Sequence, residues 1–206
     1  MIPITGGRRV VGWLWLGGLL LAGRLFATDV KPVTLEPLRY EWEVTTAMLW
    51  KVGGGGSQLP YVLMPQIISL RIPPINERPF AGGVLVFRSR FSLLLEPIVR
   101  GPEHYFVGVA AAGELEWRNP TDRFSLFFAS GGGFGLMDSK GYQVAGGQGQ
   151  DFNLNWLIHG GLRYRTAAGW QWTAGLYFQH ISNKGLNKIN PGVNALGPSL
   201  GLSRRF

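Results

Sequence analysis

Two residues near the end of the chain have the types and the spacing of a nucleophile and its base. His180 and Ser182 are two positions apart, and in an extended strand such residues face the same side, roughly 6–7 Å apart at the backbone. A histidine at that distance can take the proton of the serine hydroxyl, so that the serine oxygen attacks an ester carbonyl. The pair is the smallest unit for acyl transfer, although an isolated His-x-Ser pattern is more often structural.

The residues before this pair alternate in character, which predicts a strand that positions both side chains. One face carries the apolar residues Trp170, Trp172, Ala174, Leu176 and Phe178, and the other carries Gln171, Thr173, Gly175, Tyr177 and Gln179. Because a strand sends successive side chains to opposite faces, His180 and Ser182 continue the apolar face. Both lie at the end of the strand, next to a long loop.

The same alternation recurs along the chain and predicts the fold. The expected strands cover 39–52, 61–72, 83–99, 105–119, 124–139, 153–166, 169–182 and 195–206, with Pro65 interrupting the second one. Their polar faces mix glycine with Arg and Glu, and their apolar faces are rich in aromatic residues near the strand ends, as in barrels with a lipid-facing band and aromatic girdles. The sequence therefore predicts an all-β fold, an eight-stranded antiparallel transmembrane β-barrel of the outer-membrane type. A soluble lipocalin-like barrel is the alternative, but it does not explain the girdle-like aromatics.

The polar faces predict a packed lumen, because a barrel of eight strands has room only for side chains. We expect the inward charges to neutralise one another, and His159 to join this polar packing. A passive pore is the weakest of the functions considered, for the same reason of space. The expected interior charges are Arg88, Arg90, Glu96, Glu114, Glu116, Arg118, Arg163, Arg165 and Arg205.

Composition agrees with a membrane barrel and excludes several other classes. The chain of 206 residues has 31 glycines, 8 Trp, 6 Tyr and 12 Phe, only 16% charged residues and no cysteine. The absence of cysteine excludes a disulfide-stapled domain and a Cys-ligated metal site. The formal charge is +8, but the basic residues form no run, so we expect no nucleic acid partner. The runs Gly53–Gly56 and Gly131–Gly133 predict a flexible loop and a close backbone approach, and neither is followed by the Lys of a phosphate-binding loop.

The sequence of the first 27 residues predicts a targeting segment that is not part of the fold. Arg8 and Arg9 precede the apolar run 10–22, as in a signal peptide. We expect cleavage after Ala27, which leaves 28–206 as the barrel. A transmembrane helix is the alternative, but the run is shorter than the ~20 residues that a span needs. The expected connections are tight at 119–123 and 166–169 and longer at 140–152 and 183–194, and the chain ends on Phe206 like outer-membrane barrels.

The run from His180 to Asn194 resembles the motif of a known family. It reads His-Ile-Ser-Asn-Lys-Gly, then Leu-Asn-Lys-Ile, then Asn-Pro-Gly-Val-Asn, and a last strand follows. This sequence is similar to the PagL-type lipid A 3-O-deacylases, also known as acyloxyacyl-hydrolase-like proteins. Their motif is His-x-Ser-Asn-x-Gly followed by Asn-Pro-Gly or a close variant. The resemblance extends over the mature chain through the layout of eight strands.

This resemblance implies an esterase in the outer membrane of a Gram-negative bacterium, which removes the 3-O-linked acyl chain of lipid A in lipopolysaccharide without a metal or other cofactor. His180 would be the general base, Ser182 the nucleophile, and Asn183 and Gly185 contributors to the oxyanion site. The site would face the outer leaflet, where Lys184 and Lys188 could meet lipid A phosphates or simply be solvated. The sequence leaves the oligomeric state open, a homodimer included.

One position departs from the family pattern. The best-known members carry a Glu twelve positions after the serine, where this chain has Asn194, and no acidic residue follows Asp151. An amide oxygen can still orient the histidine but cannot stabilise an imidazolium by charge. The alternative hypothesis is therefore a barrel of structural or lipopolysaccharide-binding role with weak catalysis or none.

Overall fold

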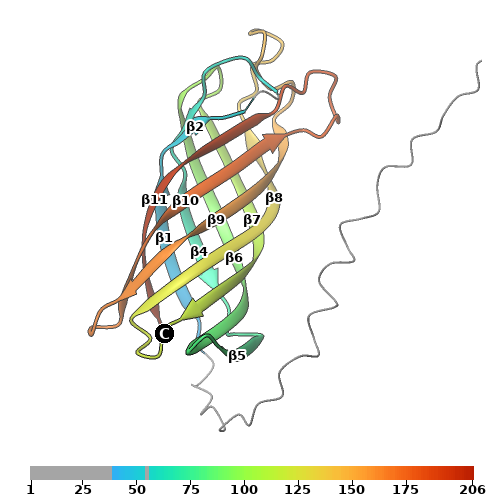
Figure 1. Cartoon of the computed structure of the whole chain (residues 1–206). Coiled ribbons are helices and arrows are strands. Elements are labelled where there is room, and N and C mark those ends of the chain that lie inside the picture. The colour runs from blue at the N-terminus through green and yellow to red at the C-terminus, as the bar shows by residue number, and fades with distance from the viewer. Residues whose placement is uncertain (1–38, 54–55) are drawn as a thin grey trace, which may run out of the picture. The chain divides into compact units, whose positions relative to one another are not determined.

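The computed structural model describes residues 39–53 and 56–206, and the predicted signal peptide 1–27 lies outside them. Strands make up nearly all of the regular structure in this part of the chain, and no helix there is long and apolar enough to cross a membrane. Figure 1 shows them as a tilted cylinder of antiparallel strands. The strands are β1 (Glu41–Ala47), β2 (Leu49–Lys51), β3 (Val62–Leu63), β4 (Gln66–Arg71), β5 (Asn76–Phe80), β6 (Gly83–Arg100), β7 (Tyr105–Arg118), β8 (Phe124–Met137), β9 (Phe152–Arg165), β10 (Trp170–Ser182) and β11 (Val193–Arg205).

The wall of the barrel closes between its first and last strands. β1 pairs with β11 from Glu41 opposite Arg205 to Ala47 opposite Ser199. β1 and β2 together form one wall strand, and β3 and β4 form the next, so that with β6 to β11 the described residues make a closed barrel of eight antiparallel strands. This confirms the predicted fold class. Pro65 separates β3 from β4 because proline has no backbone N–H to donate to a ladder.

The connection between the second and third wall strands is longer than a turn because it contains a strand of its own. The strands predicted at 61–72 and 83–99 leave residues 73–82 between them, a segment that is long for a turn. Within it, β5 pairs with the beginning of β6 from Asn76 opposite Phe87 to Phe80 opposite Gly83. Ala81 and Gly82 join the two strands with φ values of 47° and 73°, the positive angles of a two-residue hairpin turn. This arm lies at the end of the barrel where the chain terminates (Figure 1).

Ion pairs fill the half of the lumen that lies nearer to the C-terminus. Arg163 Nη1 lies 2.8 Å from Glu114 Oε1, and Arg88 Nη2 lies 3.0 Å from Glu116 Oε2. Sequence reasoning missed three members of this network, because it did not assign the faces of the first two strands. Those members, each fully buried, are Glu41, Glu43 and Arg71.

Glu96 differs from the other inward charges. We expected it to be neutralised with them, but no Lys, Arg or His of the described residues forms a salt bridge with it, and neither carboxylate oxygen has a hydrogen bond. The reason is its position, one layer nearer to the loops, where the lumen is apolar. That apolar layer includes Leu49, Leu63, Leu94, Ile98, Phe106, Met137, Leu157, Ile181 and Val193.

The predicted faces of β10 are confirmed, and this fixes where the candidate site points. Gln171, Thr173, Tyr177 and Gln179 are buried in the lumen, whereas Trp172 and Leu176 are exposed on the outer wall. Ile181 stands between His180 and Ser182 and is 1% exposed. A shift of register by one residue would exchange the two faces, so the burial of Ile181 in the apolar layer holds its neighbours outside.

The glycines of β8 permit the close strand contact that the sequence predicts. A Cβ atom on Gly131 would collide with the carbonyl oxygen of Ala111, and one on Gly133 would collide with that of Val109. The strands β7 and β8 thus approach too closely here for any side chain on these two positions.

Candidate active site at the end of the barrel wall

The structure brings His180 and Ser182 together on the outer wall, at the loop end of β10. His180 Nε2 lies 2.9 Å from Ser182 Oγ, and His180 Nδ1 lies 2.6 Å from Asn194 Oδ1. The three side chains are half-buried, so they are open to a substrate but partly shielded from water. This chain of hydrogen bonds has the arrangement of a nucleophile, a base and a group that orients the base.

Strand pairing explains how Asn194, a residue fourteen positions away, reaches the histidine. β10 and β11 form a hairpin in which His180 is directly opposite Asn194. Directly opposed residues on one face of an antiparallel pair have Cβ atoms about 4.5–5.5 Å apart, which suits a contact between an imidazole and a short amide. The register of the hairpin therefore selects position 194 as the partner of the histidine.

The hydrogen bonds also determine the state of the imidazole. The Asn194 oxygen can only accept, so Nδ1 of His180 donates to it, and Nε2 is left to accept the proton of Ser182 Oγ. This tautomer is the one in which histidine can act as a base toward the serine.

The wall around the pair is aromatic and apolar. Trp156 of β9 is directly opposite His180 and is 45% exposed, and its ring meets Phe178 edge to face with centroids 5.4 Å apart. Leu176 and Leu196 are exposed further along the same two strands. The hydroxyl of Ser182 thus stands at the upper margin of an apolar surface.

A tight turn directly follows the serine. The N–H of Leu186 donates to the carbonyl of Asn183 at 3.0 Å, and the two residues between them, Lys184 and Gly185, have φ values of 53° and 82°. Positive φ at both central positions defines a type I′ turn, in which the second position favours glycine. This geometry accounts for a glycine at the third position after Ser182.

Asn183 is the buried centre of that loop. Its side-chain oxygen accepts the N–H of Gly185 at 3.0 Å, and its side-chain nitrogen donates to the carbonyl of Ile189 at 2.8 Å. Its own backbone N–H donates to Asn190 Oδ1 at 3.0 Å. Both backbone N–H groups that we expected near the oxyanion are therefore engaged with side-chain amides in this structure.

Sequence reasoning missed two contributors to the site. Asn190 holds the backbone next to Ser182, and Gly192, with φ of 64°, lies so close to His180 that a Cβ there would be 3.4 Å from the imidazole Cε1. The signal was present in the run of asparagines, whose side chains bond to nearby backbone. Of the two lysines in this loop, Lys184 and Lys188, both are exposed.

The other histidines lie elsewhere. His159 is fully buried in the lumen, as expected, where its Nε2 lies 2.9 Å from Ser199 Oγ. His104 is exposed in the loop between β6 and β7, and its Nδ1 lies 2.6 Å from Asp138 Oδ2. Partial burial acts to raise the pKa of Asp138, but hydrogen bonds from the His104 ring and from the backbone of 104–105 lower it to about 2. His159 and Ser199 therefore form a second His–Ser pair, but both are buried in the lumen, where no substrate on the wall can reach them.

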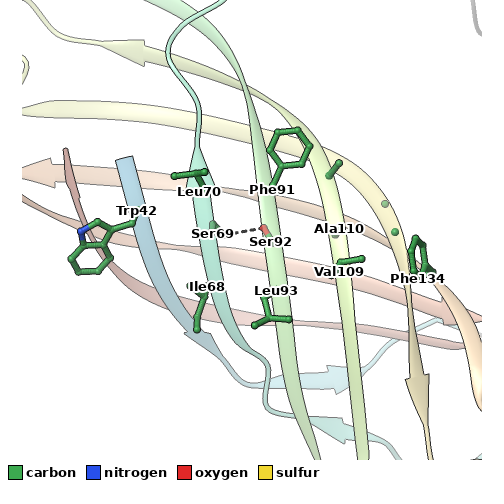
Figure 2. Close-up of a pocket in the computed structure, with 13 residues that line it drawn as sticks. Trp42, Ile68, Ser69, Leu70, Phe91, Ser92, Leu93, Val109, Ala110 and Phe134 are labelled. Carbon is green, nitrogen blue, oxygen red and sulfur yellow. Dashed lines mark hydrogen bonds between the residues drawn. The ribbon is translucent and has the colours of Figure 1, made fainter. Parts of the chain in front are cut away.

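An open apolar groove of about 600 Å³ lies on the opposite side of the barrel from the site, across β4, β6, β7 and β8. Figure 2 shows Ile68, Leu70 and Phe91 on its outer side, and behind them the hydrogen bond of 2.8 Å between Ser69 and Ser92. The two serines that line the groove are buried and bond to each other, and no His, Lys, Asp or Glu lines it to act as a base. The groove is therefore not a second candidate for the active site.

Comparisons with known proteins agree with this geometry. None of the curated proteins searched matches the chain. Among solved structures, the chain is similar to the crystal structure of the outer membrane enzyme PagL, with a TM-score of 0.51, 18% identity, and 79% of this chain and 98% of that one covered. It is also similar to Neisserial surface protein A, with a TM-score of 0.51, 11% identity, and 82% and 97% covered. At these identities the two structures show the fold, an outer-membrane barrel.

A family model gives the more specific result. The model described as lipid A 3-O-deacylase (PagL) matches residues 87–203, which is more than half of the chain and contains β7 to β10, the loop after Ser182 and most of β11. The chain therefore belongs to the PagL family of lipid A 3-O-deacylases and is a β-barrel of the outer membrane.

Proposed function

We propose that this protein hydrolyses the 3-O-linked acyl ester of lipid A, with Ser182 as the nucleophile and His180 as the general base. The observation that carries the proposal is the continuous chain of hydrogen bonds from Ser182 Oγ through the imidazole to Asn194 Oδ1, on the outer wall. Membership of the family supports the choice of substrate.

The proposed reaction has two steps. Ser182 Oγ attacks the ester carbonyl while its proton moves to Nε2 of His180, and the sugar oxygen then leaves as an alcohol with that proton. Water attacks the acyl-serine next and gives a proton to the same nitrogen, and that proton passes to Ser182 Oγ as the fatty acid departs. In both steps Asn194 would keep Nδ1 in place as a donor and fix the plane of the ring.

The oxyanion of each tetrahedral intermediate needs donors, and Asn183 and Gly185 are the proposed contributors. In the free protein the N–H of Gly185 donates to Asn183 Oδ1. An anionic oxygen is a stronger acceptor than an amide oxygen, so an exchange of this hydrogen bond toward the substrate would be favourable. The second hydrogen on the Asn183 side-chain nitrogen is a further donor.

The surroundings of the serine suit a lipid held by its head and one chain. Trp156, Phe178 and Leu176 would contact the acyl chain along the wall, with the ester at the level of Ser182. Lys184 and Lys188 are exposed in the adjoining loop, where they would meet lipid A phosphates. In this arrangement the loop end of the barrel, and the active site with it, faces the outer leaflet.

Mass spectrometry of lipid A from cells that express the protein tests this proposal. The wild-type protein should remove one hydroxyacyl chain, and Ser182→Ala and His180→Ala should each leave lipid A intact. Ser199→Ala is the matched control, because it removes the serine of the buried His–Ser pair and should leave deacylation unchanged. Intact lipid A in the presence of correctly inserted wild-type protein would refute the proposed deacylase activity.

One observation favours a second candidate function. Asn194 stands where a carboxylate would stabilise the imidazolium, which suits a barrel that binds lipopolysaccharide with its loops but turns it over slowly or not at all. Such a protein would retain lipopolysaccharide during purification, and Ser182→Ala would change neither that retention nor the lipid A of the cells.

A further inference from the structure

Four loops meet at the end of the barrel that carries the candidate site. They connect β2 to β3 (52–61), β6 to β7 (101–104), β8 to β9 (138–151) and β10 to β11 (183–192), and Figure 1 shows them together at one end. We call the last of these the catalytic loop. Hydrogen bonds join the loops to one another, and a single carboxylate lies where three of them meet.

That carboxylate belongs to Glu103, which is 1% exposed although it lies in a short loop. Its Oε2 accepts the hydroxyl proton of Tyr61 at 2.7 Å, and its Oε1 accepts the backbone N–H of Gln148 at 2.6 Å. Both of these partners are also buried. Hydrogen bonds to a carboxylate are shorter and stronger than neutral ones, so Glu103 ties the loops 52–61 and 138–151 to its own.

The burial of the Glu103 carboxylate is explained neither by the fold of the barrel wall nor by an ion pair. No Lys, Arg or His of the described residues forms a salt bridge with Glu103, and the burial of a carboxylate without a counter-ion is costly unless hydrogen bonds compensate. Such a cost at a surface loop, where a shorter or solvated connection would suffice, indicates a role in holding the loops together.

Both of the loops that Glu103 holds continue to the catalytic loop. From 138–151, the N–H of Gly149 donates to the carbonyl of Ile189 at 3.2 Å, and Asn187 Nδ2 donates to the carbonyl of Gly149 at 3.0 Å. The same carbonyl of Ile189 accepts from the side chain of Asn183, the residue directly after Ser182. This path ends one residue from the nucleophile.

The second path ends at the base. The N–H of Ser57 donates to the carbonyl of Gly192 at 2.9 Å, and Ser57 Oγ donates to the carbonyl of Gly146 at 2.7 Å, which also closes the ring between the two loops. Gly192 lies against the imidazole of His180. A displacement of the loop 52–61 would therefore release the glycine that borders the histidine ring.

We propose that Glu103 is a positioning residue for the catalytic loop, and that it acts through Tyr61 and Gln148 to hold Asn183 and Gly192 in place around Ser182 and His180. Glu103 itself contacts neither Ser182 nor His180. The inference rests on the proposed function only for its catalytic consequence, because the coupling between the loops is a property of the structure alone.

The test combines hydrogen exchange with steady-state kinetics on the full-length protein in detergent micelles with purified lipopolysaccharide. In Glu103→Ala, we expect exchange of the amide N–H groups of 183–192 to rise by about tenfold or more, and kcat to fall by a similar factor with KM changed less than about twofold. The reason is that the two hydrogen bonds by which the carboxylate holds the neighbouring loops are lost. Exchange in the wall strands β6 and β7 should not change, which shows that the barrel is folded.

Further variants separate positioning from general damage. Tyr61→Phe removes one of the two bonds and should give a smaller effect in the same direction, and Glu103→Gln keeps an acceptor for the Gln148 N–H and should restore part of the activity. Asp151→Asn is the matched control, because that carboxylate bonds only to Ser139 within its own loop, and it should leave both readouts at the wild-type values.

The two proposals fail in different ways. If the wild-type protein does not deacylate lipid A but exchange at 183–192 still rises in Glu103→Ala, the proposed function is wrong and the loop coupling stands. If exchange rises only in 138–151 and 52–61, or if kcat of an active wild-type protein is unaffected by Glu103→Ala, Glu103 is a local structural residue and the inference is overturned.

Discussion

Replacement of Asn194 by Asp tests how the orienting residue contributes to catalysis. The two side chains have the same shape, so the contact of 2.6 Å with His180 Nδ1 should persist with a carboxylate in place of an amide. A neutral hydrogen bond contributes about 0.5–1.5 kcal/mol and one to a charged group about 1.5–3 kcal/mol. When His180 becomes an imidazolium in the transition state, the gain is therefore about 1–2 kcal/mol.

That gain corresponds to roughly a 5- to 30-fold increase in kcat, since each 1.36 kcal/mol is a factor of ten. A pair of unit charges about 4 Å apart at an effective dielectric constant of 20 would give about 4 kcal/mol, but the half-exposed setting of the three side chains favours the lower figure. Asn194→Ala, which removes the acceptor, should reduce kcat by about tenfold.

The assay is the initial rate of fatty acid release from purified lipopolysaccharide, measured from pH 5 to pH 9. At each pH, Asn194→Asp should be faster than the wild type, and Asn194→Ala should be slower. Rates equal to or below the wild type at every pH in Asn194→Asp would refute the reasoning that Asn194 stands in for a carboxylate.

Three further predictions concern stability and the loop after the serine. Glu96→Gln should leave the free energy of unfolding unchanged or raise it, because the carboxylate has no partner, whereas Glu114→Gln should lower it by about 3 kcal/mol; denaturant unfolding compares them. Gly185→Ala and Gly169→Ala place Ala at φ values of 82° and 83° where a Cβ has free space, so each should cost about 1 kcal/mol, but only Gly185→Ala should reduce deacylation. Partial burial raises the pKa of Asp138, but hydrogen bonds from the facing loop hold it at about 2, against 3.8 for a free carboxyl. The carboxylate's contribution to the free energy of unfolding is therefore complete above pH 3.8 and is lost as pH falls through 2. Thermal unfolding of Asp138→Asn should differ from that of the wild type at pH 5 and converge with it at pH 2.

Alternation in the sequence was sufficient to predict the wall of the barrel. The faces of β10, and therefore the outward direction of His180 and Ser182, follow from a period of two with one face clearly apolar. Where neither face is clearly apolar, the alternation does not assign the faces of a strand. In the strand interrupted by Pro65 the faces were ambiguous, and the inward position of Arg71 became clear only from its pairing.

The loops could not be predicted in the same way, because their contacts join segments that are far apart in the chain. Glu103 bonds to residues 42 and 45 positions away, and nothing in its sequence surroundings distinguishes it from a solvated carboxylate. Asn183 and Gly185 were identified from the family motif, but their hydrogen bonds within the turn became apparent only from the geometry.

The most direct test of the central claim is the release of a free hydroxy fatty acid from lipid A by the purified protein, reconstituted in vesicles that contain lipopolysaccharide in the outer leaflet. The account predicts steady release by the wild type and by Ser199→Ala, and none by Ser182→Ala. Release that continues undiminished in Ser182→Ala would contradict the assignment of the nucleophile, and no release by the folded wild-type protein would contradict the proposed activity itself.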